Sequence, residues 1–179
     1  FLASQIVGVG SVKLRESKAI DITVEDLKKL RNMEFPVLDN ELADRMQEEI
    51  IRAKLENDSV GGLVETVVIG VKSGFGDPFF DSVESVISSL LFSIPSVKGV
   101  EFGEGFNLAG MRGSQASDEL FYNGNEISYY SNNNGGILGG ITNGMPIVFR
   151  VSVKPTASIG QTQRTVDVES GKDTTFEIK

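Results

Sequence analysis

Residues 131–158 constrain the fold of this chain more than any other stretch. Residues 131–144 read SNNNGGILGGITNG, a run rich in residues that tolerate positive φ angles and leave backbone N–H groups uncovered. Residues 147–154 then alternate with period two, which is typical of a half-buried strand. One face would carry Ile147, Phe149, Val151 and Val153, and the other Val148, Arg150, Ser152 and Lys154. Pro155 ends the strand, because proline cannot donate to a sheet ladder.

Lys154, Thr156 and Ser158 lie where this strand gives way to a loop. A cation, two hydroxyl groups and bare backbone amides together suit a phosphate group. The alternative is a tight turn that leads into an ordinary strand, because a glycine-rich motif indicates a site only in the right structural context. The residues alone leave both interpretations open.

Composition limits the kinds of site that these residues can form. The chain has no cysteine and no histidine, which excludes disulfides, thiolate metal sites and histidine-based catalytic triads within it. A net charge of −8 argues against general binding of nucleic acids or anionic membranes, but leaves room for a local basic pocket. No apolar run approaches the roughly 20 residues that span a bilayer. We therefore expect no metal site, no nucleic-acid partner and no membrane partner.

Periodicity and turn signals predict one compact α+β domain, and 179 residues are enough for its core. Strands are expected over residues 6–14, 63–71, 97–102 and 147–154, helices over 24–31, 39–57 and about 79–94, and hairpins over 121–130 and 165–178. Residues 103–119 are expected to form a long loop. The strands would be mostly antiparallel, with two long helices and one β-α-β unit.

Several motifs then occur in a fixed order. They are GFGDPFFD (74–81), KGVEFGEGF (98–106), RGS (112–114) with Asp118 and Glu119, SNNNGGILGGITNG (131–144) and KPTASI (154–159). Together they resemble the central region of chorismate synthase, over nearly the whole chain and most weakly before about residue 61.

The resemblance implies a β-α-β sandwich fold and a homotetrameric flavoprotein of the cytoplasm. It implies a carbon-oxygen lyase of the shikimate pathway, which serves aromatic amino-acid biosynthesis. The expected reaction is the 1,4-elimination of phosphate from the small molecule 5-enolpyruvylshikimate 3-phosphate to give chorismate, with reduced FMN as cofactor. Whether NADPH reduces the flavin is left open.

The resemblance also assigns the cofactor-binding residues. They are Pro95, Ser96, Gly139, Lys154, Pro155, Thr156, Ala157 and Ser158. Lys154 would supply positive charge to an anionic flavin, and its alternative role is a solvated lysine at a strand end. Pro95 ends a helix and Lys154 ends a strand, and element ends are where loops build pockets.

Other residues keep two interpretations each. Arg112 and Asp118 would serve the pocket or brace the loop by a salt bridge. Asn132, Asn133 and Asn134 would contact flavin or substrate, or perform turn chemistry. No residue of this chain is assigned a catalytic role.

The family's N-terminal histidine motif and its C-terminal Arg-Asp-Pro motif are absent from these residues. We therefore expect residues 1–179 to form a single-domain fragment from the central part of a longer chorismate synthase-like chain, inactive by itself. The alternative is a non-catalytic flavin- or phosphate-binding module of the same fold.

Overall fold

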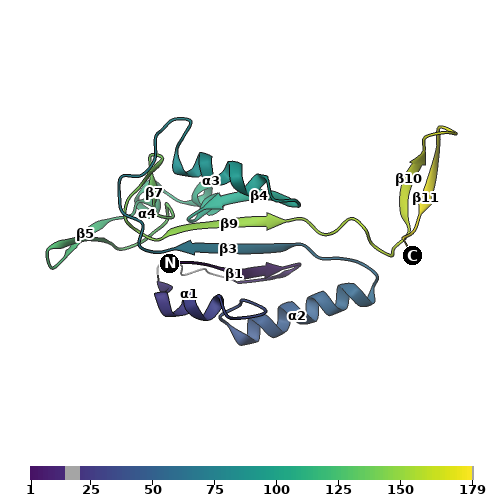
Figure 1. Cartoon of the computed structure of the whole chain (residues 1–179), viewed down its shortest axis with the longest axis horizontal. Coiled ribbons are helices and arrows are strands. Elements are labelled where there is room, and N and C mark those ends of the chain that lie inside the picture. Colours follow the sequence, from purple (N-terminus) through teal and green to yellow (C-terminus); the bar gives the residue numbers. More distant parts are fainter. Residues whose placement is uncertain (15–20, 179) are drawn as a thin grey trace.

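The computed structural model describes residues 1–14 and 21–178. Its centre is a five-stranded sheet in the order β2-β1-β3-β9-β4, with every neighbouring pair antiparallel (Figure 1). The strands are β1 (Leu2–Val9), β2 (Val12–Lys13), β3 (Gly62–Val68), β4 (Val97–Phe102) and β9 (Ile147–Val153). Because β3 and β4 are both antiparallel to β9, they are parallel to each other. They form the predicted β-α-β unit, split by β9.

Three helices flank the sheet, and local capping explains where each begins. They are α1 (Val24–Leu30), α2 (Asn40–Leu55) and α3 (Val83–Phe92). Thr23 forms a capping box with Asp26, and Asp39 accepts from the backbone N–H of Leu42. These two helices confirm the sequence prediction closely.

The third helix begins later than predicted. Ser82 caps it, and the preceding residues form a loop closed by a bridge between Asp77 and Asp81. Phe79 and Phe80, expected in the first turn, are instead 91% and 90% exposed in this loop.

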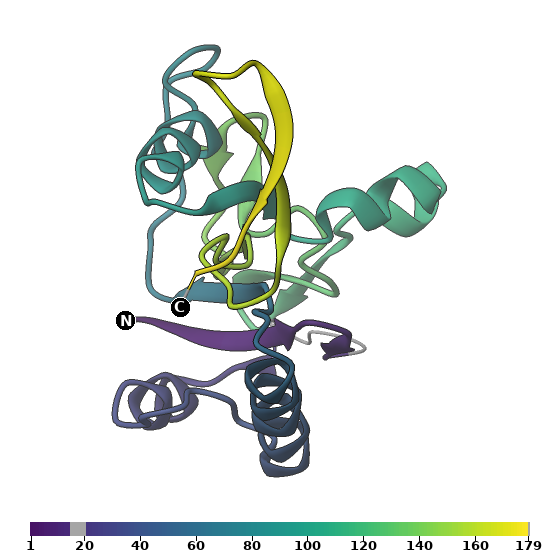
Figure 2. The ribbon, with the colours of Figure 1, turned by 90° about the vertical axis from the view of Figure 1, so that its right-hand side faces the viewer.

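The central strand β9 is buried on both faces, so the prediction of a half-buried strand was wrong. Val148 packs with Leu27 of α1, whereas its neighbour Phe149 packs in the cluster that includes Ile87 of α3. Successive strand residues point to opposite faces, so α1 and α3 cover opposite faces of β9. Both views of the ribbon show α1 and α2 on one side of the stacked strands and α3 on the other (Figures 1 and 2).

The N-terminal strand is longer and more bent than expected. β1 starts at Leu2, and a turn at Gly10, with φ +54°, leads into β2, so the predicted strand over 6–14 is a hairpin. A register shift between Ile6 and Gly8 marks a bulge in the pairing of β1 with β3. The helix α2 packs its buried Met46 against Val9 of this hairpin.

The remaining elements are small. The expected loop over 103–119 contains the 3-10 helix η2 (Gly105–Gly110) and the short helix α4 (Gly113–Ala116). The two predicted hairpins are present as β5 (Leu120–Asn123) with β6 (Glu126–Tyr129), and β10 (Gln163–Asp167) with β11 (Lys172–Phe176). A third hairpin, β7 (Ile137–Leu138) with β8 (Ile141–Thr142), was not predicted.

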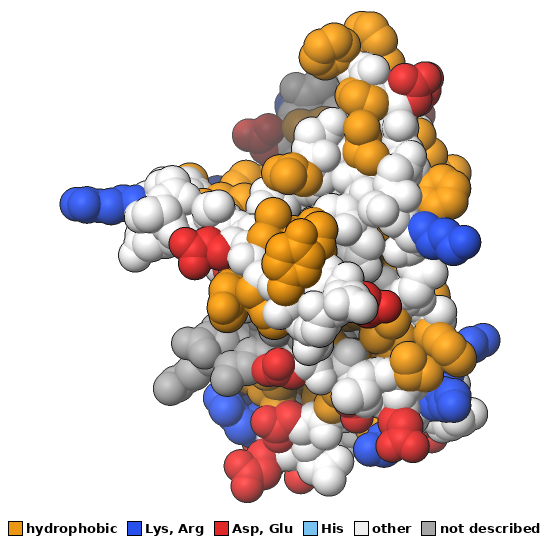
Figure 3. All heavy atoms as spheres, turned by 90° about the vertical axis from the view of Figure 1, so that its left-hand side faces the viewer, with side chains coloured by type: hydrophobic (Ala, Val, Ile, Leu, Met, Phe, Trp, Pro, Cys, Tyr) orange, Lys and Arg blue, Asp and Glu red, His pale blue; other side chains and the backbone are white. Residues whose placement is uncertain are grey.

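Two hairpins lie outside the main body. In Figure 1, β10 and β11 extend away at one end and β5 at the other. Figure 3 shows exposed apolar side chains on the face that carries the β5–β6 hairpin, whose Tyr122 and Ile127 are 76% and 61% exposed. None of the helices within the described ranges is long and apolar enough to cross a membrane. The α+β class with mostly antiparallel strands is confirmed.

Candidate functional site

The turn between α3 and β4 and the segment after β9 meet at one end of the sheet. β4 and β9 are paired up to this end, and the backbone N–H of Lys154 donates to the carbonyl of Ser96 at 2.9 Å. The structure therefore brings Pro95 and Ser96 next to Lys154 and Pro155, as the cofactor assignment requires. Ser96 has φ +73°, a left-handed conformation that residues other than glycine seldom adopt. Such backbone outliers cluster at ligand sites, where the surroundings hold them in place.

The segment after Lys154 presents unused backbone donors. Within residues 1–14 and 21–178, the N–H groups of Thr156, Ala157 and Ser158 make no hydrogen bond. Two side chains hold the segment in place through its carbonyl groups. The Ser59 hydroxyl donates to the carbonyl of Thr156 at 2.7 Å, and Gln163 Nε2 donates to the carbonyl of Ala157 at 3.2 Å. Free N–H groups on a braced, exposed segment are suited to bind an anionic oxygen.

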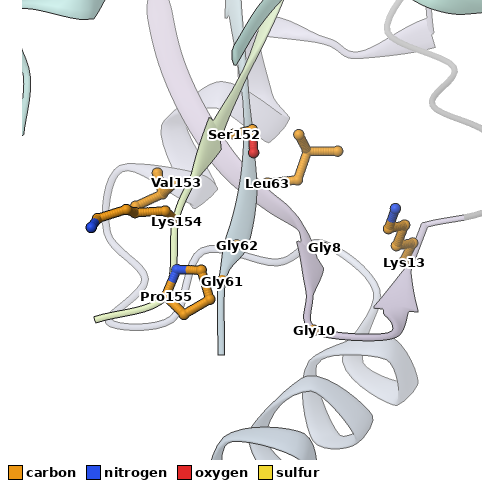
Figure 4. A pocket seen from close by; sticks show the side chains of 10 residues that line it. All are labelled: Gly8, Gly10, Lys13, Gly61, Gly62, Leu63, Ser152, Val153, Lys154 and Pro155. Atoms are coloured by element: carbon orange, nitrogen blue, oxygen red, sulfur yellow. The ribbon is translucent and has the colours of Figure 1, made fainter. Parts of the chain in front are cut away.

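A cavity of about 380 Å³ adjoins Lys154 and Pro155 (Figure 4). Small-molecule sites commonly measure about 300–1,000 Å³. The other lining residues are Gly8, Gly10, Lys13, Gly61, Gly62, Leu63, Ser152 and Val153. Figure 4 shows Lys13 and Lys154 on opposite sides of the cavity, with Leu63 and Ser152 between them. The sequence did not single out Lys13, because it lies more than a hundred residues before Lys154.

Gly139 lies elsewhere. It forms the two-residue turn between β7 and β8 with Gly140, and both have positive φ, +62° and +85°. The carbonyl of Gly140 accepts from the N–H of Val83, in the first turn of α3, whereas Pro95 follows the last turn. The 10 residues of α3 correspond to about 15 Å. The structure of one chain thus separates Gly139 from the other assigned residues.

Asp118 organises the asparagine-rich loop instead of pairing with an arginine. Its carboxylate accepts from the Ser131 hydroxyl at 2.7 Å and from the backbone N–H groups of Asn133 and Asn134 at 2.6 and 3.0 Å. Burial would raise the pKa of Asp118, but these hydrogen bonds outweigh it and lower the pKa below its usual range. No ion pair joins Asp118 to Arg112 in the part of the chain that the structure describes. Asp118 therefore braces the loop through hydrogen bonds, and the expected salt bridge with Arg112 was wrong.

The asparagines are used in turn bonding. Asn132 accepts from the N–H of Gly136 at 2.7 Å and donates to the carbonyl of Pro146 at 2.9 Å, while Asn133 donates to the carbonyl of Gln115 at 3.0 Å. These contacts favour turn chemistry over ligand contact for Asn132 and Asn133.

Comparison with known proteins identifies the family to which these motifs belong. The sequence model of chorismate synthase matches residues 2–179. The chain belongs to the chorismate synthase family. The segments at residues 95–96, 139 and 154–158 therefore lie within a chorismate synthase-type sequence.

Curated relatives and a solved structure agree with this membership. The chorismate synthase of Korarchaeum cryptofilum is 42% identical over 170 residues, which cover 94% of this chain and 47% of that protein. That of Methanosarcina acetivorans is 39% identical over 178 residues, which cover 99% of this chain and 48% of that protein. A crystal structure of chorismate synthase matches with a TM-score of 0.79 and 32% identity, over 88% of this chain and 50% of that one. The chorismate synthase type of fold is confirmed, and the chain spans about half the length of the curated relatives it matches.

A buried charged row crosses the same sheet and was missed by the sequence reasoning. Arg150 donates from Nε to Glu65 Oε2 at 2.9 Å and from Nη1 to Glu101 Oε1 at 3.0 Å, and Gln5 donates to Glu65 Oε1 at 3.0 Å. The four residues are direct register partners on β1, β3, β9 and β4. Burial would lower the pKa of Arg150, but the hydrogen bond and charge of Glu101 and Glu65 raise it.

This row has a structural consequence at η2. Glu101 Oε2 also accepts from the N–H of Phe106 at 3.3 Å, so Arg150 is linked to the start of η2 through Glu101. A charged residue stands in each of three predicted strands, namely Glu65, Glu101 and Arg150, and this pattern could have indicated the row.

The described residues contain no cluster of His, Cys, Asp or Glu side chains able to hold a metal ion.

Proposed function

We propose that this chain supplies the flavin-binding wall of a chorismate synthase, a lyase that eliminates phosphate from 5-enolpyruvylshikimate 3-phosphate to give chorismate. Family membership supports the reaction. The observation that carries the site is the junction of Ser96 with Lys154, followed by three backbone N–H groups at residues 156–158 that find no partner among the described residues. An exposed cation beside free N–H groups suits a ligand with a phosphate group.

These residues fit reduced FMN as the cofactor. Lys154 would neutralise negative charge on the cofactor, and the N–H groups of Thr156, Ala157 and Ser158 would donate to its anionic oxygens. Pro95 and Ser96 would form the adjoining wall, where the left-handed φ of Ser96 fixes the direction of its carbonyl toward Lys154. Reduced FMN, when bound, supplies an electron that helps the phosphate leave. The chain's own contribution is to bind and orient.

We also propose that Gly139 contacts the flavin. This contact is separate from that of Lys154, because α3 lies between the two residues. We further propose a homotetramer located in the cytoplasm, with no nucleic-acid or membrane partner. We place the protein in the shikimate pathway, and NADPH is a candidate reductant for the flavin. Residues 1–179 alone are expected to be inactive.

Anaerobic turnover by the full-length protein tests the function. The protein is mixed with 5-enolpyruvylshikimate 3-phosphate and either reduced FMN, oxidised FMN or no flavin, and chorismate and phosphate are measured. Equal release of chorismate and phosphate with reduced FMN alone would support the proposal. Flavin binding without any product would instead support a non-catalytic flavin-binding module.

A further inference from the structure

A second lysine stands on the cavity beside Lys154. Lys13, Gly8, Leu63 and Ser152 are successive register partners on β2, β1, β3 and β9. Side chains of register partners share one face of a sheet, so this row forms a continuous strip of that face. Lys154 lies two residues after Ser152, directly beyond the last residue of β9. Figure 4 shows Lys13 and Lys154 at opposite ends of this row, with the Lys154 side chain extending away from Ser152.

Glycines at and beside the strip leave space next to the two lysines. Gly8 has no side chain, and a Cβ there would lie 3.2 Å from Leu63 Cβ and 3.4 Å from Lys13 Cγ. At Gly61, which also lines the cavity, a Cβ would lie 2.9 Å from the carbonyl oxygen of Val153, so there is little room for a side chain there. Glycine at these positions leaves the cavity of about 380 Å³ open between the two cations.

Both lysines are exposed. In the described ranges, no carboxylate lies within ion-pair distance of Lys13 or Lys154, although the chain has a net charge of −8. Strands lie about 4.8 Å apart, so the three steps from β2 to β9 span about 14 Å. Flexible lysine side chains from both sides can turn into a space of this width.

We propose that Lys13 is a second anion-binding residue of the Lys154 site, and that the cavity between them takes a phosphate monoester. This inference rests on the proposed function, which supplies two such ligands, FMN and 5-enolpyruvylshikimate 3-phosphate. Lys13 contributes charge and a donor from the β1–β2 hairpin, opposite the donors of residues 154–158.

The test uses the full-length protein and its Lys13→Ala, Lys13→Arg and Lys172→Ala variants. Lys172 is an exposed lysine of the distant β10–β11 hairpin, and its removal changes the net charge equally. Dissociation constants are measured for FMN, for riboflavin, which lacks the phosphate, and for 5-enolpyruvylshikimate 3-phosphate. Thermal unfolding verifies that each variant folds.

The three dissociation constants distinguish the phosphate of FMN from the phosphate of the substrate. If Lys13→Ala weakens FMN binding about tenfold but leaves riboflavin unchanged, the cavity takes the flavin phosphate. A similar loss confined to 5-enolpyruvylshikimate 3-phosphate assigns the substrate phosphate instead. Lys13→Arg should retain most of the affinity in either case. If a folded Lys13→Ala binds all ligands as tightly as Lys172→Ala does, the proposal is overturned.

Failure of the proposed function is distinguishable from failure of this inference. Wild-type protein that binds neither FMN nor the substrate contradicts the proposed function. Inorganic phosphate, followed by ³¹P line broadening, then decides the inference. Binding to the wild type that is lost in Lys13→Ala supports the anion site, and equal behaviour of the two proteins overturns it.

Discussion

The backbone N–H of Lys154 donates to the carbonyl of Ser96 at 2.9 Å. This bond joins two loops that lie nearly 60 residues apart in the sequence, one after a helix and one after a strand. They meet because β4 and β9 are neighbours in the sheet, with Val97 paired to Val153. The proposed flavin wall is thus a consequence of strand order.

Arg150 is expected to be essential for stability. Replacing it with methionine removes the ion pair between Arg150 Nε and Oε2 of Glu65, a residue that is 0% exposed. Removing one partner of a buried ion pair costs about 3–5 kcal/mol in the free energy of unfolding. Urea denaturation of Arg150→Met, beside the exposed control Arg164→Met, measures this cost.

The double variant Arg150→Met/Glu65→Gln gives a second check. It should be more stable than Arg150→Met, because the buried carboxylate is no longer charged. A loss below about 1 kcal/mol in Arg150→Met, similar to an exposed pair, would contradict a structural role for the charged row.

Asp118 should stabilise the protein in a pH-dependent way. Its pKa is lower in the folded state, so its contribution is fully present above its unfolded pKa of about 3.9. The contribution is lost as the pH falls through the still lower folded pKa. Asp118→Asn should therefore lower the free energy of unfolding at pH 7 by about 1–3 kcal/mol, because loop N–H groups lose a charged acceptor.

The pH profile distinguishes this role from a generic charge effect. The difference between wild type and Asp118→Asn should stay constant from pH 7 to about 5 and shrink only at lower pH. Thermal unfolding across this range, with exposed Asp44→Asn as control, measures it. A difference that already disappears between pH 7 and 5 would argue against the hydrogen-bonded carboxylate.

Gly139 can be tested without breaking its turn. Asparagine tolerates positive φ, and a Cβ at Gly139 would meet no atom within 4 Å, so Gly139→Asn should keep the melting temperature nearly unchanged. If Gly139 contacts the flavin, FMN affinity falls in this variant. Unchanged FMN affinity would restrict Gly139 to turn chemistry.

Local signals predicted the elements well. The expected starts of α1 and α2 coincide with caps at Thr23 and Asp39, and the expected hairpin over 121–130 turns at Asn123-Gly124. The late start of α3 was missed because Phe79 and Phe80 look like core residues, while Ser82 provides the cap. Capping competed with hydrophobic periodicity, and the cap determined the boundary.

The site was predictable only in part, because its parts depend on strand order. Resemblance to a family identified residues 95–96 and 154–158, and the structure brings these together. Burial of Arg150 could not be inferred from alternation along one strand, since Glu65 and Glu101 reach it from neighbouring strands. Lys13 joins the cavity for the same reason, through the pairing of β2, β1, β3 and β9.

The dissociation constant of FMN for full-length Lys154→Ala tests whether Lys154 binds the flavin. It is measured by flavin fluorescence at fixed ionic strength, beside wild type and the matched Lys172→Ala control. We expect a loss of about 1–3 kcal/mol in binding free energy, or roughly 5- to 150-fold in affinity, for Lys154→Ala alone. A folded Lys154→Ala protein that binds FMN as tightly as wild type would show that Lys154 is not part of the flavin site.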